Sequence, residues 1–156
     1  MESGFSVIPG TKEQQYEGLA PMIRAVIGPE KDPIANMANV AALLKAQFGW
    51  HWVGFYRVVG EELVLGPFQG PVACTRIAKG RGVCGTCWEK KETVMVDDVH
   101  SFPGHIVCSP FSLSEIVVPV MKDNEVVAVL DIDSDKRSDF TETDRVFLEK
   151  ICGWLV

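Results

Sequence analysis

The sequence lacks the features that mark several large classes of protein. It has no apolar run long enough to cross a bilayer, and its polar start, 1–4, lacks the basic-then-apolar pattern of a signal peptide. It also lacks a basic stripe: the 15 Lys and Arg residues are outnumbered by 21 Asp and Glu, which gives a formal net charge of −6. A nucleic-acid partner normally requires such a stripe. We therefore expect a cytoplasmic protein that binds neither nucleic acid nor membrane.

The sequence also lacks the even number of cysteines that a framework of structural disulfides needs. The five are Cys74, Cys84, Cys87, Cys108 and Cys152. An odd count without a leader argues against a framework of structural disulfides. In a reducing compartment each cysteine is a buried apolar residue, a metal ligand or a reactive thiol.

What is present is the composition of one ordinary globular domain over 1–156. Hydrophobic residues make up 47% and charged residues 23%, a balance that allows a proper core. Apolar spacing and end signals predict helices over 11–27, 32–48, 83–90 and from 141 onward, and strands over 50–59, 62–65, 73–77, 93–96, 115–121 and 125–133. Gly66-Pro67 should end the second strand, and 100–114 should be a long loop. Strands joined by hairpins favour an α+β fold, with a central antiparallel sheet of about six strands flanked by helices.

Three cysteines are candidates for chemistry. Cys108 lies in the expected loop, where a thiol is accessible and its thiolate can react, although it can also be a free cysteine that packs. Cys84 lies where a short helix begins; a helix N-terminus lowers a thiol pKa, but a small buried residue in a tight turn fits equally. Cys74 is also compatible with a core strand position. Cys84 and Cys87 form a C-x-x-C, which is either a dithiol motif or half a zinc site, but no second close pair completes a standard zinc spacing.

Two carboxylates stand near the end of an apolar strand. Asp131 and Asp133 are two residues apart, so the strand period places them on one face with Val127 and Val129. Burying them costs free energy unless they meet a cation, a donor or a ligand, and burial raises a carboxyl pKa toward the range of a general acid. Glu115 heads the neighbouring strand. For Asp133, a capping or turn role before Ser134 is the alternative.

Two aromatic residues share one face of the first strand. Trp52 and Tyr56 are four residues apart, a spacing that is mostly found in cores. Aromatic rings also pack well against sulfur. The pair therefore either fills the core or lines a pocket for an apolar or sulfur-bearing group.

As a set, the motifs resemble the free methionine-(R)-sulfoxide reductases, which are stand-alone GAF domains. The resemblance covers residues 16–151, and the matching stretches are 66–70, 73–77, 80–85, 96–99, 105–108, 114–119 and 130–134. The chain departs from the family at Ser109-Pro110-Phe111, where relatives carry an aspartate and small residues. Cys87 and Cys152 fall outside the family's three cysteines; we interpret Cys87 as incidental and Cys152 as a core residue.

The resemblance implies roles for eight residues. Cys108 would be the nucleophile, Cys74 the main resolving thiol and Cys84 a supporting one. Glu115, Asp131 and Asp133 would hold the substrate ammonium and the sulfoxide oxygen, and one of them would donate the proton. Trp52 and Tyr56 would line the methyl end of the pocket, and the backbone near Cys108 would bind the substrate carboxylate.

The resemblance thus predicts reduction of free methionine-(R)-sulfoxide through a sulfenic acid and an intramolecular disulfide. A thioredoxin-like protein would be the external reductant, no metal or bound cofactor would be needed, and a homodimer is suggested. Two alternatives remain: a GAF module that senses a small molecule without catalysis, and a redox-sensing or zinc-holding protein that uses Cys84 and Cys87.

Overall fold

The computed structural model of the chain describes residues 4–105 and 109–156. It contains the helices α1 (Lys12–Ile27), α2 (Pro33–Phe48), α3 (Gly82–Lys90) and α4 (Glu142–Gly153), and the 3-10 helix η1 (Val99–Ser101). Its strands are β1 (Trp52–Val59), β2 (Glu62–Gln69), β3 (Arg76–Ala78), β4 (Val94–Val96), β5 (Ser114–Lys122) and β6 (Glu125–Ser134).

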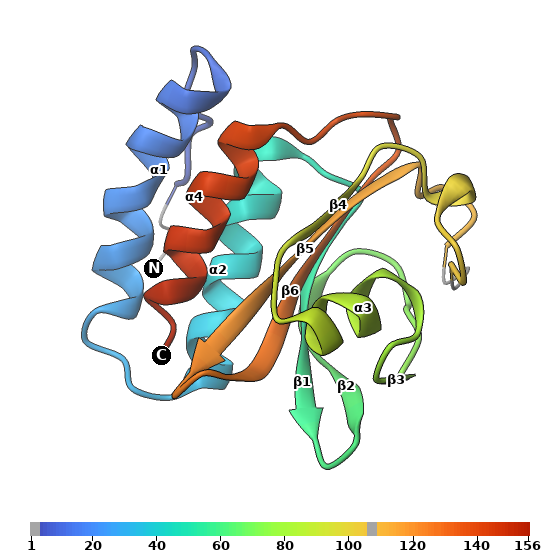
Figure 1. The fold of residues 1–156 in the computed structure, drawn as a ribbon. Coiled ribbons are helices and arrows are strands. Elements are labelled where there is room, and N and C mark those ends of the chain that lie inside the picture. The colour runs from blue at the N-terminus through green and yellow to red at the C-terminus, as the bar shows by residue number, and fades with distance from the viewer. Residues whose placement is uncertain (1–3, 106–108) are drawn as a thin grey trace.

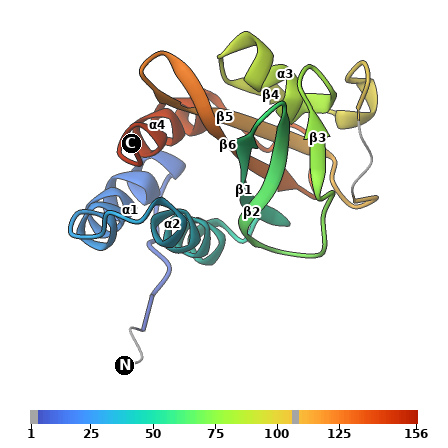
Figure 2. The ribbon, with the colours of Figure 1, turned by 90° about the horizontal axis from the view of Figure 1, so that it is seen from below.

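The six strands form one antiparallel sheet in the order β3-β2-β1-β6-β5-β4. Helices α1, α2 and α4 cover one face of this sheet, called here the helix face (Figures 1 and 2). Helix α3 lies on the opposite face, called here the pocket face (Figure 2). The expected α+β architecture with about six antiparallel strands is confirmed.

The helices begin and end at capping residues that can be recognised in the sequence. Thr11 forms a capping box with Gln14 at the start of α1, and the Asp32 carboxylate accepts hydrogen bonds from the backbone of α2. Gly49 ends α2 in the left-handed conformation, with φ 66°, which glycine adopts without steric cost. Among the described residues, no helix is long and apolar enough to cross a bilayer.

Gly66-Pro67 does not end the second strand, and this expectation is wrong. Strand β2 continues to Gln69, and its register against β1 shifts between the pairs Gly54–Phe68 and Tyr56–Leu65. The shift leaves one extra residue on β2, which is a β-bulge. A bulge tolerates proline because it does not require every backbone N–H in the ladder.

A second irregularity changes the face of one valine. The register of β5 against β6 shifts between the pairs Val120–Ala128 and Met121–Val126. As a result Val127 packs against the helix-face core, whereas Val126 and Val129 belong to the core of the pocket face. The expectation that Val127 shares the face of Asp131 and Asp133 is therefore wrong, and for Val129 it is right.

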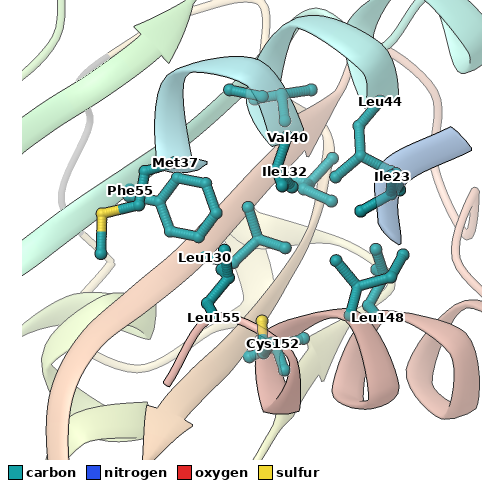
Figure 3. Close-up of a cluster of buried hydrophobic side chains, with 14 of the residues drawn as sticks. Ile23, Met37, Val40, Leu44, Phe55, Leu130, Ile132, Leu148, Cys152 and Leu155 are labelled. Atoms are coloured by element: carbon teal, nitrogen blue, oxygen red, sulfur yellow. The ribbon is translucent and has the colours of Figure 1, made fainter. Parts of the chain in front are cut away.

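Most of the hydrophobic core lies under the three helices. Figure 3 shows side chains of α1, α2 and α4 meeting residues of β1 and β6, such as Phe55, Leu130 and Ile132. Cys152 of α4 is 1% exposed in this cluster, which confirms it as a core residue. This layer gives the sheet a rigid support from which the pocket face is built.

The connections on the pocket face are the least regular parts of the fold. Strand β3 begins only at Arg76, so Cys74 lies in the connection 70–75 and not in a strand as the 73–77 prediction had it. The predicted loop 100–114 contains the end of η1 and the first residue of β5, Ser114, and is otherwise irregular where it is described.

Candidate active site

A pocket opens on the pocket face beside β1, β5 and β6. Its walls come from these strands, from the start of α3, from the connection 70–75 and from the loop before β5. The lining residues are Trp52, Tyr56, Val72, Ala73, Ile77, Arg81, Gly82, Val83, Cys84, His105, Ser109, Ser112, Glu115, Asp131 and Asp133. Seven of the eight residues that the sequence singled out are described, and the pocket gathers all of these except Cys74.

Strand pairing brings the three carboxyls together. Glu115 of β5 lies directly opposite Asp133 of β6, and Asp131 shares the face of Asp133. Glu115 and Asp131 are each 6% exposed, and Asp133 is half-buried. The acidic cluster of Glu115, Asp131 and Asp133 therefore forms one wall of the pocket, as the spacing predicts.

Burial and mutual repulsion raise the pKa values of this acidic cluster. The pKa of Glu115 is raised well above its ordinary range by burial and then by Asp131 and Asp133. Burial and the charge of Asp131 likewise raise the pKa of Asp133. Burial also raises the pKa of Asp131, against hydrogen bonds from its neighbours that lower it. Three adjacent carboxyls hinder one another's ionisation, so the cluster keeps its protons to higher pH than isolated carboxyls do.

Asp131 carries an unsatisfied oxygen in this cluster. Its Oδ1 is buried and has no hydrogen-bond partner among the residues that the structure describes. A buried carboxylate oxygen without a donor costs free energy. A ligand that brings an N–H or ammonium group to this position would recover that cost.

Cys84 stands against the acidic cluster. It lies in the first turn of α3 and is 5% exposed. Burial raises its thiol pKa well above the usual range, and Asp131 and Glu115 raise it further. The expectation that the helix N-terminus lowers this pKa is wrong, because desolvation and two acidic neighbours outweigh the helix dipole.

The aromatic wall combines packing with two hydrogen bonds. The rings of Trp52 and Tyr56 stack with centroids 5.9 Å apart, and Phe68 stacks on Trp52 at 5.2 Å. The indole Nε1–H donates to the Pro71 carbonyl at 3.0 Å, and the Tyr56 hydroxyl donates to the Cys74 carbonyl at 2.9 Å. Trp52 and Tyr56 thus belong to the core of the pocket face and also line the pocket.

The other thiols separate into two groups. Cys74 is half-buried in the connection 70–75 and is disulfide-bonded. Cys84, Cys87 and Cys152 are free and buried. Cys108, the predicted nucleophile, lies outside the described residues.

Cys84, Glu115 and Asp131 also form the one group of potential metal ligands among the described residues. One ligand atom from each lies within 4.8 Å of the others. Cys87 does not belong to this group, because it points into the core of the pocket face with 0% exposure. The C-x-x-C therefore does not act as a two-thiol half-site in this arrangement.

Four polar residues of the pocket lining were not predicted from the sequence as site residues, namely Arg81, His105, Ser109 and Ser112. Arg81, the residue before α3, brings a cation to the rim, and its signal was the 80–85 motif. His105 also lines the pocket; burial and then His100 lower its pKa. Ser109 lines the pocket while its hydroxyl contacts His51 Nε2 at 3.1 Å, a pairing across 58 residues that no local pattern announces.

Comparison with known proteins agrees with this geometry. Residues 35–153 match the GAF domain family. The chain is 54% identical to GAF domain-containing protein A of Dictyostelium discoideum, over 97% of this chain and 96% of that protein. It is 41% identical to free methionine-R-sulfoxide reductase of Escherichia coli, over 92% of this chain and 88% of that enzyme.

A solved structure extends the likeness to three dimensions. Free methionine-R-sulfoxide reductase from Neisseria meningitidis, solved in complex with its substrate, superposes with a TM-score of 0.95 at 48% identity, covering 99% of this chain and 93% of that one. The chain therefore belongs to the GAF-domain family of free methionine-R-sulfoxide reductases.

Proposed function

We propose that this protein is an oxidoreductase that reduces free L-methionine-(R)-sulfoxide to L-methionine. The observation that carries the proposal is the pocket in which the acidic cluster faces the aromatic wall of Trp52 and Tyr56. A free amino acid sulfoxide offers matching groups, namely an ammonium, a polar S–O bond and an apolar methyl. Relatives of this protein that are named free methionine-R-sulfoxide reductase support the assignment.

Each group of the substrate has a counterpart in the proposed complex. The ammonium is held by the acidic cluster, where the unpartnered Oδ1 of Asp131 is a ready acceptor. The methyl and the sulfur pack against Trp52 and Tyr56. The substrate carboxylate binds backbone N–H groups near Cys108. A peptide-bound methionine has no free ammonium, so this arrangement selects the free amino acid.

In the proposed first step the thiolate of Cys108 attacks the sulfoxide sulfur. The S–O oxygen takes a proton from the acidic cluster and is transferred to the cysteine, so that the sulfoxide is reduced to methionine and the thiolate is oxidised to a sulfenic acid. Glu115 and Asp133 are the candidate proton donors, because burial and their acidic neighbours raise their pKa values and so favour the protonated form. No metal or bound cofactor takes part.

In the proposed second step the Cys74 thiol condenses with the sulfenic acid to form a disulfide and water. A dithiol of a thioredoxin-like protein then reduces that disulfide by exchange and becomes oxidised itself. The disulfide-bonded state of Cys74 supports its part in this pairing. The raised pKa of Cys84 disfavours its thiolate, so we assign Cys84 a supporting role.

Three cysteine variants test this assignment by the formation of methionine from free methionine-(R)-sulfoxide. Cys108→Ser should abolish the reaction, because no thiolate remains to attack. Cys74→Ser should yield one methionine per protein and then stop, since thioredoxin has no disulfide to reduce. Cys87→Ala, which removes a buried thiol on α3 outside the pocket, is the control and should turn over normally. Full activity of Cys108→Ser would exclude it as the nucleophile.

A substrate panel separates this function from a sensor. The R and S epimers, each free and peptide-bound, are compared with thioredoxin as reductant, and thiols are titrated before and after addition. We expect turnover with the free R epimer alone and a loss of thiols only there. A GAF sensor would bind the ligand without losing thiols.

We further propose that residues 1–156 act as one GAF domain, as a cytoplasmic homodimer. Sedimentation of the purified protein tests the oligomeric state, and a monomer at micromolar concentration would refute that part.

A further inference from the structure

We infer that Tyr56 and Trp52 are positioning residues for the resolving step: their hydrogen bonds hold the backbone of the connection 70–75 so that Cys74 can reach the oxidised nucleophile. The inference rests on the proposed function and deepens it. It gives the aromatic wall a task in recycling that is distinct from contact with substrate.

The connection 70–75 is irregular, and in this structure the disulfide of Cys74 also restrains it. It belongs to no helix or strand, and Val72 at its centre is 88% exposed. Its far end is tied to the sheet by the Leu65 N–H, which donates to the Thr75 carbonyl at 2.9 Å. Before that point two carbonyls are held by side chains of β1, namely Pro71 by Trp52 and Cys74 by Tyr56.

Both donors are rigidly placed. Trp52 is 4% and Tyr56 2% exposed, and their rings stack on one another. The indole is also fixed at Gly70, where an added Cβ would lie 2.6 Å from Trp52 Cδ1. The Tyr56 hydroxyl keeps its proton, because burial and then Asp131 raise its pKa beyond any physiological range. It therefore donates to the Cys74 carbonyl at every working pH.

The hydrogen bond to Cys74 acts on the residue that carries the resolving sulfur. Fixing its carbonyl limits the positions that the Cα, and hence the thiol, can sample. Disulfide formation between two groups on one chain depends on the effective concentration of one at the other. A net hydrogen bond is worth about 1 kcal/mol, so its removal should slow the condensation about fivefold.

Tyr56→Phe tests this, since it removes the hydroxyl and retains the ring. The protein is reduced, mixed with the sulfoxide and quenched at intervals. Methionine measures the first step, and mass spectrometry measures the disulfide and the sulfenic acid trapped by dimedone. We expect the ratio of disulfide formation to methionine formation to fall about fivefold, with more trapped sulfenic acid. Trp52→Phe, which releases the Pro71 carbonyl, should shift the ratio in the same direction. Thr75→Ala, an exposed position of the same connection that lies outside the pocket lining, should not.

Hydrogen peroxide provides a second arm that does not depend on the substrate, because it oxidises a thiolate to a sulfenic acid with release of hydroxide. Slower condensation in Tyr56→Phe after peroxide supports the positioning role even if the wild type makes no methionine, an outcome that would refute the proposed function alone. An unchanged ratio in both arms, with methionine formation reduced, would overturn the inference and leave Tyr56 a substrate contact. If Tyr56→Phe does not fold, Trp52→Phe decides by the same readout.

Discussion

At the scale of single residues, the pKa values of the pocket side chains depend on which ionisable groups are buried next to one another. Glu115, Asp131 and Asp133 would be ordinary carboxylates on an exposed strand end. Paired across β5 and β6 and covered by the pocket walls, they compete for protons instead. The same surroundings suppress the Cys84 thiolate, so the environment that favours a proton donor disfavours a nucleophile at this place.

Glu115→Gln should lower the turnover rate and raise the stability of the folded protein above acidic pH. If Glu115 donates the proton, turnover should fall about a hundredfold or more. Its pKa is raised in the folded protein, so the contribution of this carboxyl to stability is most favourable below the ordinary value of 4.5 and is lost as the pH rises above it. Each unit of that shift corresponds to about 1.4 kcal/mol. The variant lacks this penalty and should therefore become more stable than the wild type as pH rises.

Urea unfolding from pH 4 to 8 measures this difference, with Glu61→Gln in the exposed turn after β1 as the control. A gap between variant and wild type that is constant over this range would show that Glu115 is not buried in an acidic cluster.

At the scale of elements, the position of α3 depends on a close backbone approach. Gly85 lies in the second turn of α3, and its carbonyl accepts a hydrogen bond from the Gly80 N–H at 2.9 Å. An added Cβ would lie 2.6 Å from the Ala78 carbonyl oxygen. A backbone atom cannot turn aside as a side chain can, so α3 with Cys84 would have to move.

Gly85→Ala should therefore destabilise the protein by about 1–3 kcal/mol and weaken substrate binding, since α3 forms part of the pocket. Gly153→Ala in α4 is the matched control: no atom lies within 4 Å of the added Cβ, and the change should stabilise by up to about 1 kcal/mol. Thermal unfolding and KM compare the two. Equal stability of both variants would contradict the tight contact.

At the scale of the whole molecule, one buried carboxylate joins the two ends of the chain. Asp144 of α4 is 0% exposed. Its Oδ1 accepts from the Tyr16 hydroxyl at 2.6 Å, and its Oδ2 accepts from Lys12 Nζ at 2.7 Å and from the Thr141 N–H at 2.8 Å. One side chain thus caps α4 and ties it to α1, more than 120 residues away.

Asp144→Ala should lower the free energy of unfolding by about 3 kcal/mol, because the buried Tyr16 hydroxyl loses its acceptor and Lys12 loses its carboxylate, keeping only the Asp139 carbonyl. Arg145→Ala, which removes exposed ion pairs on the same helix, should change it little. Chemical denaturation measures both. If Asp144→Ala is no worse than Arg145→Ala, the layer of three helices is held by apolar packing alone.

A structural feature of this protein can be predicted from the sequence when it depends on residues that are close together in the chain. Helix caps at Thr11 and Asp32 and the stop at Gly49 are local, and their positions follow from the residues themselves. The strand period placed Asp131 and Asp133 on one face for the same reason. The bulges at Gly66-Pro67 and at Val127 were missed, because a bulge is a property of two paired strands and not of one.

The sequence by itself determined most of the elements and their order, since these follow from backbone preferences within a few residues, and it supplied the candidate reactive groups as predictions. Only the tertiary structure decided the protonation of those groups and their partners. It set Cys84 beside two buried carboxyls, reversing the expected pKa shift, and it placed the Tyr56 hydroxyl on the Cys74 carbonyl. Desolvation and long-range hydrogen bonds depend on atoms far apart in the chain, and no local pattern of residues specifies them.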